Sequence, residues 1–248
     1  RRCCGICRTA AVFRRNRRRQ ILNDRPGGVD RRAGVVAPHR ELELAAKARQ
    51  IAYGKHLPLL GEKLAVPDAD DRNPDFAVLL AFSKLDGSCI GTVRVQIANQ
   101  QQLRLEESYA LPKALRTGRI AEVSRLAIPA RSNGLALRLM LIKAAYWYSR
   151  ANLVDRCFLC VRYPVDRQYR RFDLDDVLQP DEFVAMKHIG MIPHRILWFD
   201  VFHIEARWLL GANPLHSVYF SSSHPDLLQN IQMRTLQLET QNQLRSIG

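Results

Sequence analysis

The sequence lacks the apolar runs that membrane and secreted proteins carry. No stretch approaches the roughly 18 consecutive apolar residues of a membrane-spanning helix, and the arginine-dense start has no apolar segment of a secretory signal. Several enzyme motifs are also missing, because no G-x-S-x-G, P-loop or dinucleotide-binding fingerprint occurs. We therefore expect a cytoplasmic protein and set aside the enzyme classes that depend on these motifs.

Cysteine and histidine are too few and too dispersed to predict a metal site or a disulfide. Three of the six cysteines fall within the first seven residues, where no fourth ligand for zinc follows at a suitable spacing. Cys157 and Cys160 form a C-x-x-C in a segment with the pattern of a strand, where side chains three apart point to opposite faces. We predict two buried thiols there and no metal. Three histidines also lie too far apart for a metal spacing (His188, His194 and His203).

Acidic residues are nearly absent from the first 40 positions, which hold 12 Lys and Arg against only Asp24 and Asp30. The net charge of the chain is +14, and +10 of it lies there; the other 208 residues carry 26 basic and 22 acidic side chains, or +4. We expect residues 1–38 to be a disordered basic extension, either an organelle transit peptide or a segment upstream of the true start, since residue 1 is not Met. Phosphate contacts from this extension would offer an alternative function, a nucleic-acid-binding protein with a catalytically inactive body.

The rest of the chain alternates helix and strand patterns, which predicts one mixed α/β domain over 39–210, followed by a C-terminal loop and amphipathic helix over 211–248. A strand, a helix and a strand in succession (121–128, 136–150 and 157–163) predict a parallel, right-handed crossover. The other predicted strands are 76–82 and 89–97, joined as a hairpin by an Asp-Gly turn, and 196–204. The other predicted helices are 41–53, 181–189, a short one near 112–116, and one after Pro225. The acidic stretch 66–75 is predicted to be an exposed loop.

The loop before residue 136 has the chemistry of an anion site. A glycine-containing turn between strand and helix leaves backbone N–H groups unpaired at the helix N-terminus, where the helix dipole also favours negative charge. Gly134 lets the backbone approach a phosphate closely, Ala136 keeps the helix start uncrowded, and Arg131 adds a charge-assisted hydrogen bond.

This R-x-x-G-x-A spacing, preceded by A-E-V-S-R-L-A-I, resembles the signature of the GNAT superfamily of N-acyltransferases. Together with the earlier G-T-V-R-V strand, it is similar to the branch that contains the long-chain N-acyl amino acid synthases and the acyl-homoserine-lactone synthases. The resemblance implies a GNAT-like acyl-CoA N-acyltransferase fold with no permanently bound cofactor. It also implies an acyl-phosphopantetheine donor, which contacts the end of the strand and the following loop (Leu126, Ala127, Ile128, Arg131, Ser132, Asn133, Gly134, Leu135 and Ala136).

The resemblance also suggests two catalytic residues. Glu122 matches a glutamate general base on the strand, although a strand carboxylate paired with an arginine is the alternative. Strict strand alternation places Glu122 and Arg125 on opposite faces, so they are not predicted to be a local pair. Tyr169, in Q-Y-R-R-F, is the nearest match to a tyrosine general acid, but the Gly-Phe that should follow is absent, which leaves a structural role open.

The implied reaction moves a fatty acyl group from a thioester, on an acidic acyl carrier protein, to the α-amine of an amino acid or similar small amine. An α-amine is mostly protonated at pH 7, so a carboxylate must accept its proton. A backbone N–H within 126–128 would stabilise the oxyanion. The alternatives are a homoserine-lactone synthase, which the absence of Trp before Trp147 makes the weaker match, and a CoA-dependent N-acetyltransferase.

Overall fold

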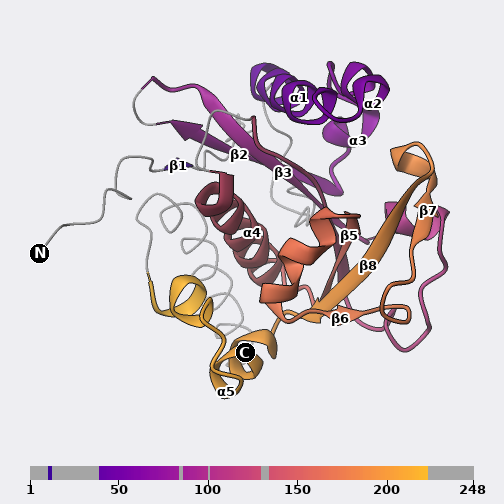
Figure 1. Cartoon of the computed structure of the whole chain (residues 1–248), viewed down its shortest axis with the longest axis vertical. Helices are drawn as coiled ribbons and strands as arrows, with labels where there is room; N and C mark the ends of the chain where they lie inside the picture. The colour runs from indigo at the N-terminus through magenta and orange to yellow at the C-terminus, as the bar shows by residue number, and fades with distance from the viewer. Residues whose placement is uncertain (1–10, 13–38, 84–85, 100, 130–133, 223–248) are drawn as a thin grey trace, which may run out of the picture.

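The computed structural model describes residues 11–12, 39–83, 86–99, 101–129 and 134–222 (Figure 1). Its centre is a mixed sheet with the strand order β1-β2-β3-β4-β5-β8-β6, and β7 also pairs with β8. The strands are β1 (Ala11–Val12), β2 (Phe76–Ser83), β3 (Cys89–Ile97), β4 (Ile120–Ala127), β5 (Arg156–Arg162), β6 (Asp175–Asp176), β7 (Val184–Met186) and β8 (Ile192–Asp200). The helices are α1 (His39–Gly54), α2 (Pro58–Lys63), α3 (Ala69–Arg72), α4 (Gly134–Ala151) and α5 (Ile204–Leu210), with short helical turns η1 (Arg104–Glu107), η2 (Val165–Phe172), η3 (Lys187–Ile189) and η4 (Ser217–Ser221).

The predicted hairpin is confirmed, and so is the parallel pairing of the two strands on either side of α4. β2 and β3 pair antiparallel, and Gly87 has the left-handed φ of +70° that the Asp-Gly turn requires. β4 and β5 are parallel and are joined by α4, which lies across the sheet in Figure 1. The two faces of the sheet differ, because alternate residues of β3 point to opposite sides. Val93 and Val95 join the apolar core against α4, whereas Arg94 faces the side where α1 packs.

Helix α4 is packed on both sides, as its apolar circumference predicts. Leu141 and Ala144 are fully buried in the core under the sheet. On another side, Lys143 is buried, and its Nζ donates hydrogen bonds to the carbonyl oxygens of Val218 (2.6 Å) and Ser222 (2.7 Å). These bonds attach the described part of the C-terminal segment to α4.

The prediction of an exposed loop over 66–75 was wrong. The segment contains α3, whose first turn is capped by the Asp68 side chain, and Asp71 is fully buried. Arg49 Nη1 donates to both carboxylate oxygens of Asp71, at 2.6 and 2.8 Å, and Arg94 contacts Asp68, Asp70 and Asp71. The acidic run is buried because it neutralises two arginines that are themselves 1% exposed, which its own composition could not indicate.

The helix predicted over 181–189 was also wrong. Val184–Met186 forms β7 against β8, and only the turn η3 follows, ending at Gly190 with a left-handed φ of +76°. Pairing with β8 has overridden the local helix pattern. The short helix predicted near 112–116 is a turn instead. The 3-10 helix of the connection between β3 and β4 is η1, at Arg104–Glu107. The predicted terminal helix and most of the basic extension lie outside the described residues.

Within the described ranges, no helix has both the length and the apolar character needed to span a membrane.

Asp71→Ala should lower the free energy of unfolding by about 3–5 kcal/mol, because it leaves Arg49 and Arg94 buried without this carboxylate. Urea denaturation measures the loss. Glu107→Gln is a matched control, since Glu107 pairs with Arg104 at the surface and should cost less than about 1 kcal/mol. An equally small loss for Asp71→Ala would contradict a structural role for the buried cluster.

Candidate active site

Strands β4 and β5 separate part of the way along their length. Their parallel pairing runs from Ile120↔Arg156 to Val123↔Leu159, although both strands continue beyond it. A bulge in β4 accompanies the separation, since Thr92 and Arg94 of β3 pair with Ala127 and Ser124, three residues apart instead of two. A cavity of about 380 Å³ lies at this point, and residues 122–128 of β4 and the loop after it line one wall.

The cavity receives part of the predicted donor site. Leu126, Ala127 and Ile128 line it, and Arg138 and Ile142 of α4 close another wall. Gly134 begins α4, and a Cβ added there would meet no atom of the described residues within 4 Å, so these residues leave this end of the helix uncrowded. The described cavity lining does not include Leu135, which is exposed, or Ala136. The predicted Arg131, Ser132 and Asn133 lie outside the described residues.

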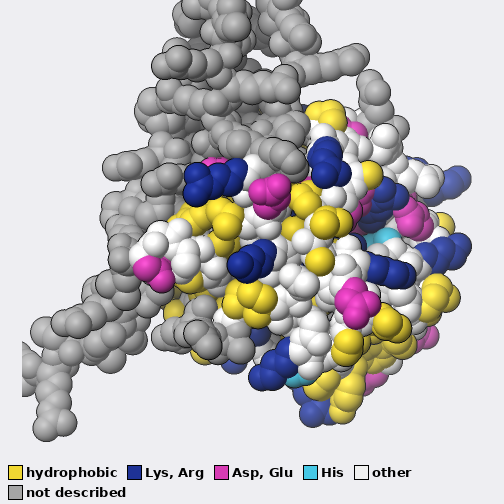
Figure 2. All heavy atoms as spheres, turned by 90° about the horizontal axis from the view of Figure 1, so that it is seen from above, with side chains coloured by type: hydrophobic (Ala, Val, Ile, Leu, Met, Phe, Trp, Pro, Cys, Tyr) yellow, Lys and Arg dark blue, Asp and Glu magenta, His cyan; other side chains and the backbone are white. Residues whose placement is uncertain are grey.

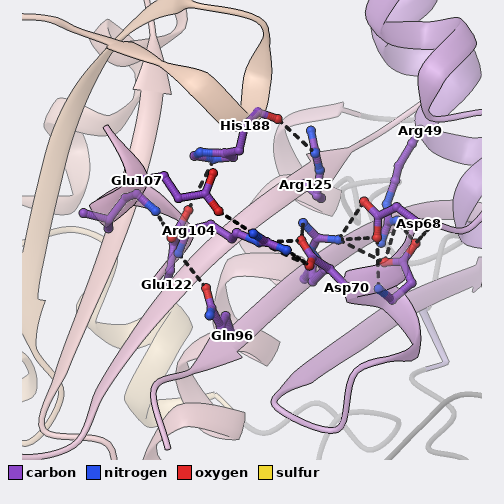
Figure 3. A network of polar contacts seen from close by, with 12 residues as sticks. Arg49, Asp68, Asp70, Gln96, Arg104, Glu107, Glu122, Arg125 and His188 are labelled. Atoms are coloured by element: carbon purple, nitrogen blue, oxygen red, sulfur yellow. Dashed lines mark hydrogen bonds and ion pairs between the residues drawn. The ribbon is translucent and has the colours of Figure 1, made fainter. Parts of the chain in front are cut away.

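The bulge overturns the prediction that Glu122 and Arg125 face opposite sides. Arg125 has a φ of +53°, which breaks the alternation after Ser124, and both Glu122 and Arg125 line the cavity. His188 contacts both of them. Arg125 Nη2 donates to the His188 carbonyl oxygen at 3.5 Å, and His188 Nε2 lies 3.7 Å from Glu122 Oε1 (Figure 3). The extra residue in β4 therefore brings a carboxyl and a guanidinium to one cavity.

Glu122 is buried, with 1% of its surface exposed. Its Oε2 accepts a hydrogen bond from the Leu105 backbone N–H at 2.8 Å, and among the described residues its Oε1 has no hydrogen-bond partner. Burial raises the pKa of Glu122 to about 7, against the lowering effects of the Leu105 N–H and of Arg94 and Arg125. No arginine of the described chain forms an ion pair with Glu122. The carboxyl is therefore available to gain and lose a proton near neutral pH.

Histidine 188 is a site residue that the sequence analysis missed. Its side chain is 9% exposed, and neither ring nitrogen has a hydrogen-bond partner within the described residues. Burial lowers the pKa of His188 to about 4, so the imidazole is neutral at pH 7. No local motif marks this residue, because η3 is placed at the cavity by tertiary contacts, among them the pairing of β7 with β8 and a hydrogen bond from Lys187 N to Ser108 Oγ (2.8 Å).

Tyr169 also lines the cavity, from η2. Its ring is buried beside Phe172, with 5.7 Å between the ring centroids, and burial raises its pKa to about 12. The hydroxyl therefore stays protonated at neutral pH. The position is compatible with both the structural and the proton-donating roles.

The two cysteines of β5 lie on opposite faces, as predicted. Cys157 is fully buried in the core against α4, and Cys160 packs against the second apolar cluster and lines the cavity. Burial raises the pKa of both thiols.

The fold is that of the GNAT N-acyltransferases. The structure of a GNAT-family protein from Desulfovibrio desulfuricans is similar over 77% of this chain and 99% of its own, with a TM-score of 0.50 and 12% identity. The structure of FeeM, an N-acyl amino acid synthase from uncultured soil microbes, is similar over 72% of this chain and 93% of its own, with a TM-score of 0.56 and 18% identity. BjaI, a CoA-dependent acyl-homoserine lactone synthase solved with SAM and isopentyl-CoA, gives a TM-score of 0.49 at 14% identity over 71% of this chain and 84% of its own.

The sequence itself matches the family model described as N-acyl amino acid synthase FeeM over residues 52–186, which is 135 of the 248 residues. The chain belongs to this family and is an N-acyltransferase. No curated protein matches it. The family match confirms the branch that the sequence motifs indicated.

Glu122→Gln should change how stability depends on pH. From pH 4.5, the ordinary pKa of the group, to pH 7, the folded protein holds a proton on Glu122 that the unfolded chain has lost, so rising pH favours unfolding. For this reason the free energy of unfolding of the wild type should fall by about 3 kcal/mol between pH 4.5 and 8, and that of the glutamine variant should not. Urea unfolding at both pH values measures the difference. Glu107→Gln is the control, and equal pH dependence in all three proteins would contradict the raised pKa.

Proposed function

We propose that this N-acyltransferase moves a fatty acyl group from an acyl-phosphopantetheine thioester to the α-amine of an amino acid. The observation that carries the proposal is the position of Glu122, a buried carboxyl with a pKa of about 7, in the cavity where β4 leaves β5. A base with that pKa matches the operating pH of an amine acylation. The name of the family, N-acyl amino acid synthase, supports an amino acid as acceptor.

The proton transfers assign a role to Glu122. The ammonium form of the acceptor gives a proton to the carboxylate of Glu122, directly or through water, and the free amine then attacks the thioester carbon. The carbon–sulfur bond breaks as the tetrahedral intermediate collapses. The departing thiolate, with a pKa near 8.5, takes up a proton from the Tyr169 hydroxyl at the cavity wall and becomes the thiol. The nitrogen of the new amide loses its second proton, which restores the Tyr169 hydroxyl directly or through water. Glu122 then releases the first proton to solvent, so the net products are the amide, the thiol and one proton.

The separation of β4 from β5 supports a role for the β4 backbone. Beyond Val123 the pairing with β5 has ended, so backbone groups of residues 124–128 no longer bond to β5, although the Leu126 carbonyl oxygen accepts a hydrogen bond from the Tyr53 hydroxyl at 3.3 Å. An N–H of the segment Leu126–Ile128 would donate to the oxyanion, and the same edge would hold the pantetheine arm by strand-like hydrogen bonds. The N-terminus of α4, an 18-residue helix, would then receive the phosphate.

An acyl carrier protein is the donor that we propose, with acyl-CoA as the alternative. Arg138 and Arg162 lie on the cavity wall, where they can meet the phosphate or an acidic surface beside it. Figure 2 shows Lys and Arg side chains spread among Asp and Glu over one face of the described residues, so carrier docking would depend on local basic side chains. Use of either acyl thioester as donor would agree with the cytoplasmic location predicted from the sequence.

Membership in an enzyme family sets aside the alternative of a binding protein with an inactive body. Any nucleic-acid contacts of the basic extension concern residues 1–38, most of which lie outside the described chain.

Mass spectrometry of lipid extracts from a host that overexpresses the chain should detect N-acyl amino acids. Glu122→Gln should reduce the product by about two to four orders of magnitude, as expected for loss of a general base. The exposed substitution Glu107→Gln is the control for expression. An acyl lactone as the main product would contradict the amino acid acceptor, and undiminished turnover in Glu122→Gln across pH 6–9 would contradict the assigned base.

A further inference from the structure

Arg125 differs from Arg49 and Arg94, the two fully buried arginines, because among the described residues it has no ion-pair partner. Arg49 and Arg94 are each held by carboxylates of the acidic segment. The Nε of Arg125 is buried without a hydrogen-bond partner in the described chain, and its Nη2 reaches a neutral carbonyl oxygen at 3.5 Å. An unpaired guanidinium in a partly buried position is costly, and an anionic ligand would offset that cost.

The backbone conformation that directs Arg125 toward the cavity is itself strained. Its φ of +53° is uncommon for a residue other than glycine, and without the bulge the side chain would point to the opposite face from Glu122. Strain and an unpaired charge therefore coincide at one position. Such a combination is typical of a binding residue whose partner arrives with the substrate.

We propose that Arg125 binds the α-carboxylate of the amino acid acceptor and thereby presents its α-amine to Glu122. The inference rests on the proposed function and extends it by naming the residue that recognises the acceptor class. His188 lies between the two groups, with its carbonyl oxygen toward Arg125 and its ring beside Glu122 (Figure 3). An α-amino acid carries its amine and carboxylate on one carbon, so it can reach both groups. The planar guanidinium offers paired N–H donors that match a carboxylate.

The other cations at the cavity are less suited to this role. Burial lowers the pKa of His188 to about 4 and also lowers that of His194, so both rings are neutral at pH 7. Arg138 and Arg162 belong to α4 and β5, and Arg138 is hydrogen-bonded to Gln168 at the surface. Arg125, in contrast, lies on the same strand as Glu122.

The α-carboxylate of the acceptor also needs a cation beside it, for an electrostatic reason. A second negative charge beside Glu122 would oppose ionisation of that base, and repulsion would weaken acceptor binding. Arg125 compensates for the incoming charge. An amine without a carboxylate would leave the guanidinium unpaired, so the site would discriminate against simple amines.

The test compares two acceptors, an amino acid that wild type acylates and the amine with the same side chain but no carboxylate. Wild type should prefer the amino acid by about 100-fold or more in kcat/KM, since a hydrogen-bonded charge pair contributes on this scale. Arg125→Gln should lower kcat/KM for the amino acid by about 10²–10³-fold, mainly through KM, and change the value for the amine by less than about threefold. Arg125→Lys keeps the charge but loses the paired N–H donors of the guanidinium. Its kcat/KM for the amino acid should therefore lie between the values of wild type and Arg125→Gln.

The controls separate acceptor binding from other roles. Arg156→Gln changes an arginine on β5 that donates to Thr117 away from the cavity, and it should leave the preference between acceptors intact. An equal loss on both acceptors in Arg125→Gln would show a structural role and overturn the proposal, as would a rise in donor KM alone or no change at all. If wild type acylates amines and no amino acid, the proposed function itself fails, and that result is independent of the Arg125 variants.

Discussion

The site depends on one extra residue in β4. The bulge opposite Thr92 and Arg94 changes the direction of the strand after Ser124, and the pairing of β4 with β5 ends at Val123. Two parallel strands that stayed paired would leave no cavity and no free strand edge. Because they separate, the end of β4 is exposed to a ligand, and Arg125 turns to the same side as Glu122. The fold and the chemistry thus share one local irregularity.

The buried acidic segment supports this arrangement from the α1 side of the sheet. Asp70 contacts both Arg94 of β3 and Arg104 of η1, and the following residue of η1 donates its N–H to Glu122. The cluster therefore links α1, β3 and the turn whose N–H binds Glu122. By binding the neighbouring arginines, it also keeps them from forming an ion pair with Glu122, which would lower its pKa and weaken it as a base near neutral pH.

Local patterns predicted the parts of the fold that depend on local physics. The Asp-Gly turn of the β2–β3 hairpin and the strand–helix–strand unit around α4 follow from turn chemistry and hydrophobic periodicity, and both are confirmed. The family motif predicted Glu122 and the end of β4 as parts of the site. The misses depend on tertiary partners that no local pattern shows: burial of Asp71 requires Arg49, 22 residues away, and the segment 181–189, with His188, is determined by the pairing of β7 with β8. The bulge at Arg125 has no signal in residue type, because its φ is imposed by pairing with β3.

The central claim is that the carboxyl of Glu122 exchanges its proton near neutral pH in the empty, folded enzyme. Carbon-13 NMR of the glutamate side-chain carboxyls measures this directly, with the Glu122 resonance assigned by its loss in Glu122→Gln. The account predicts a midpoint near pH 7 for this resonance, since burial outweighs the Leu105 N–H and the nearby arginines. A midpoint at or below 4.5, the ordinary value for a glutamate, would contradict it.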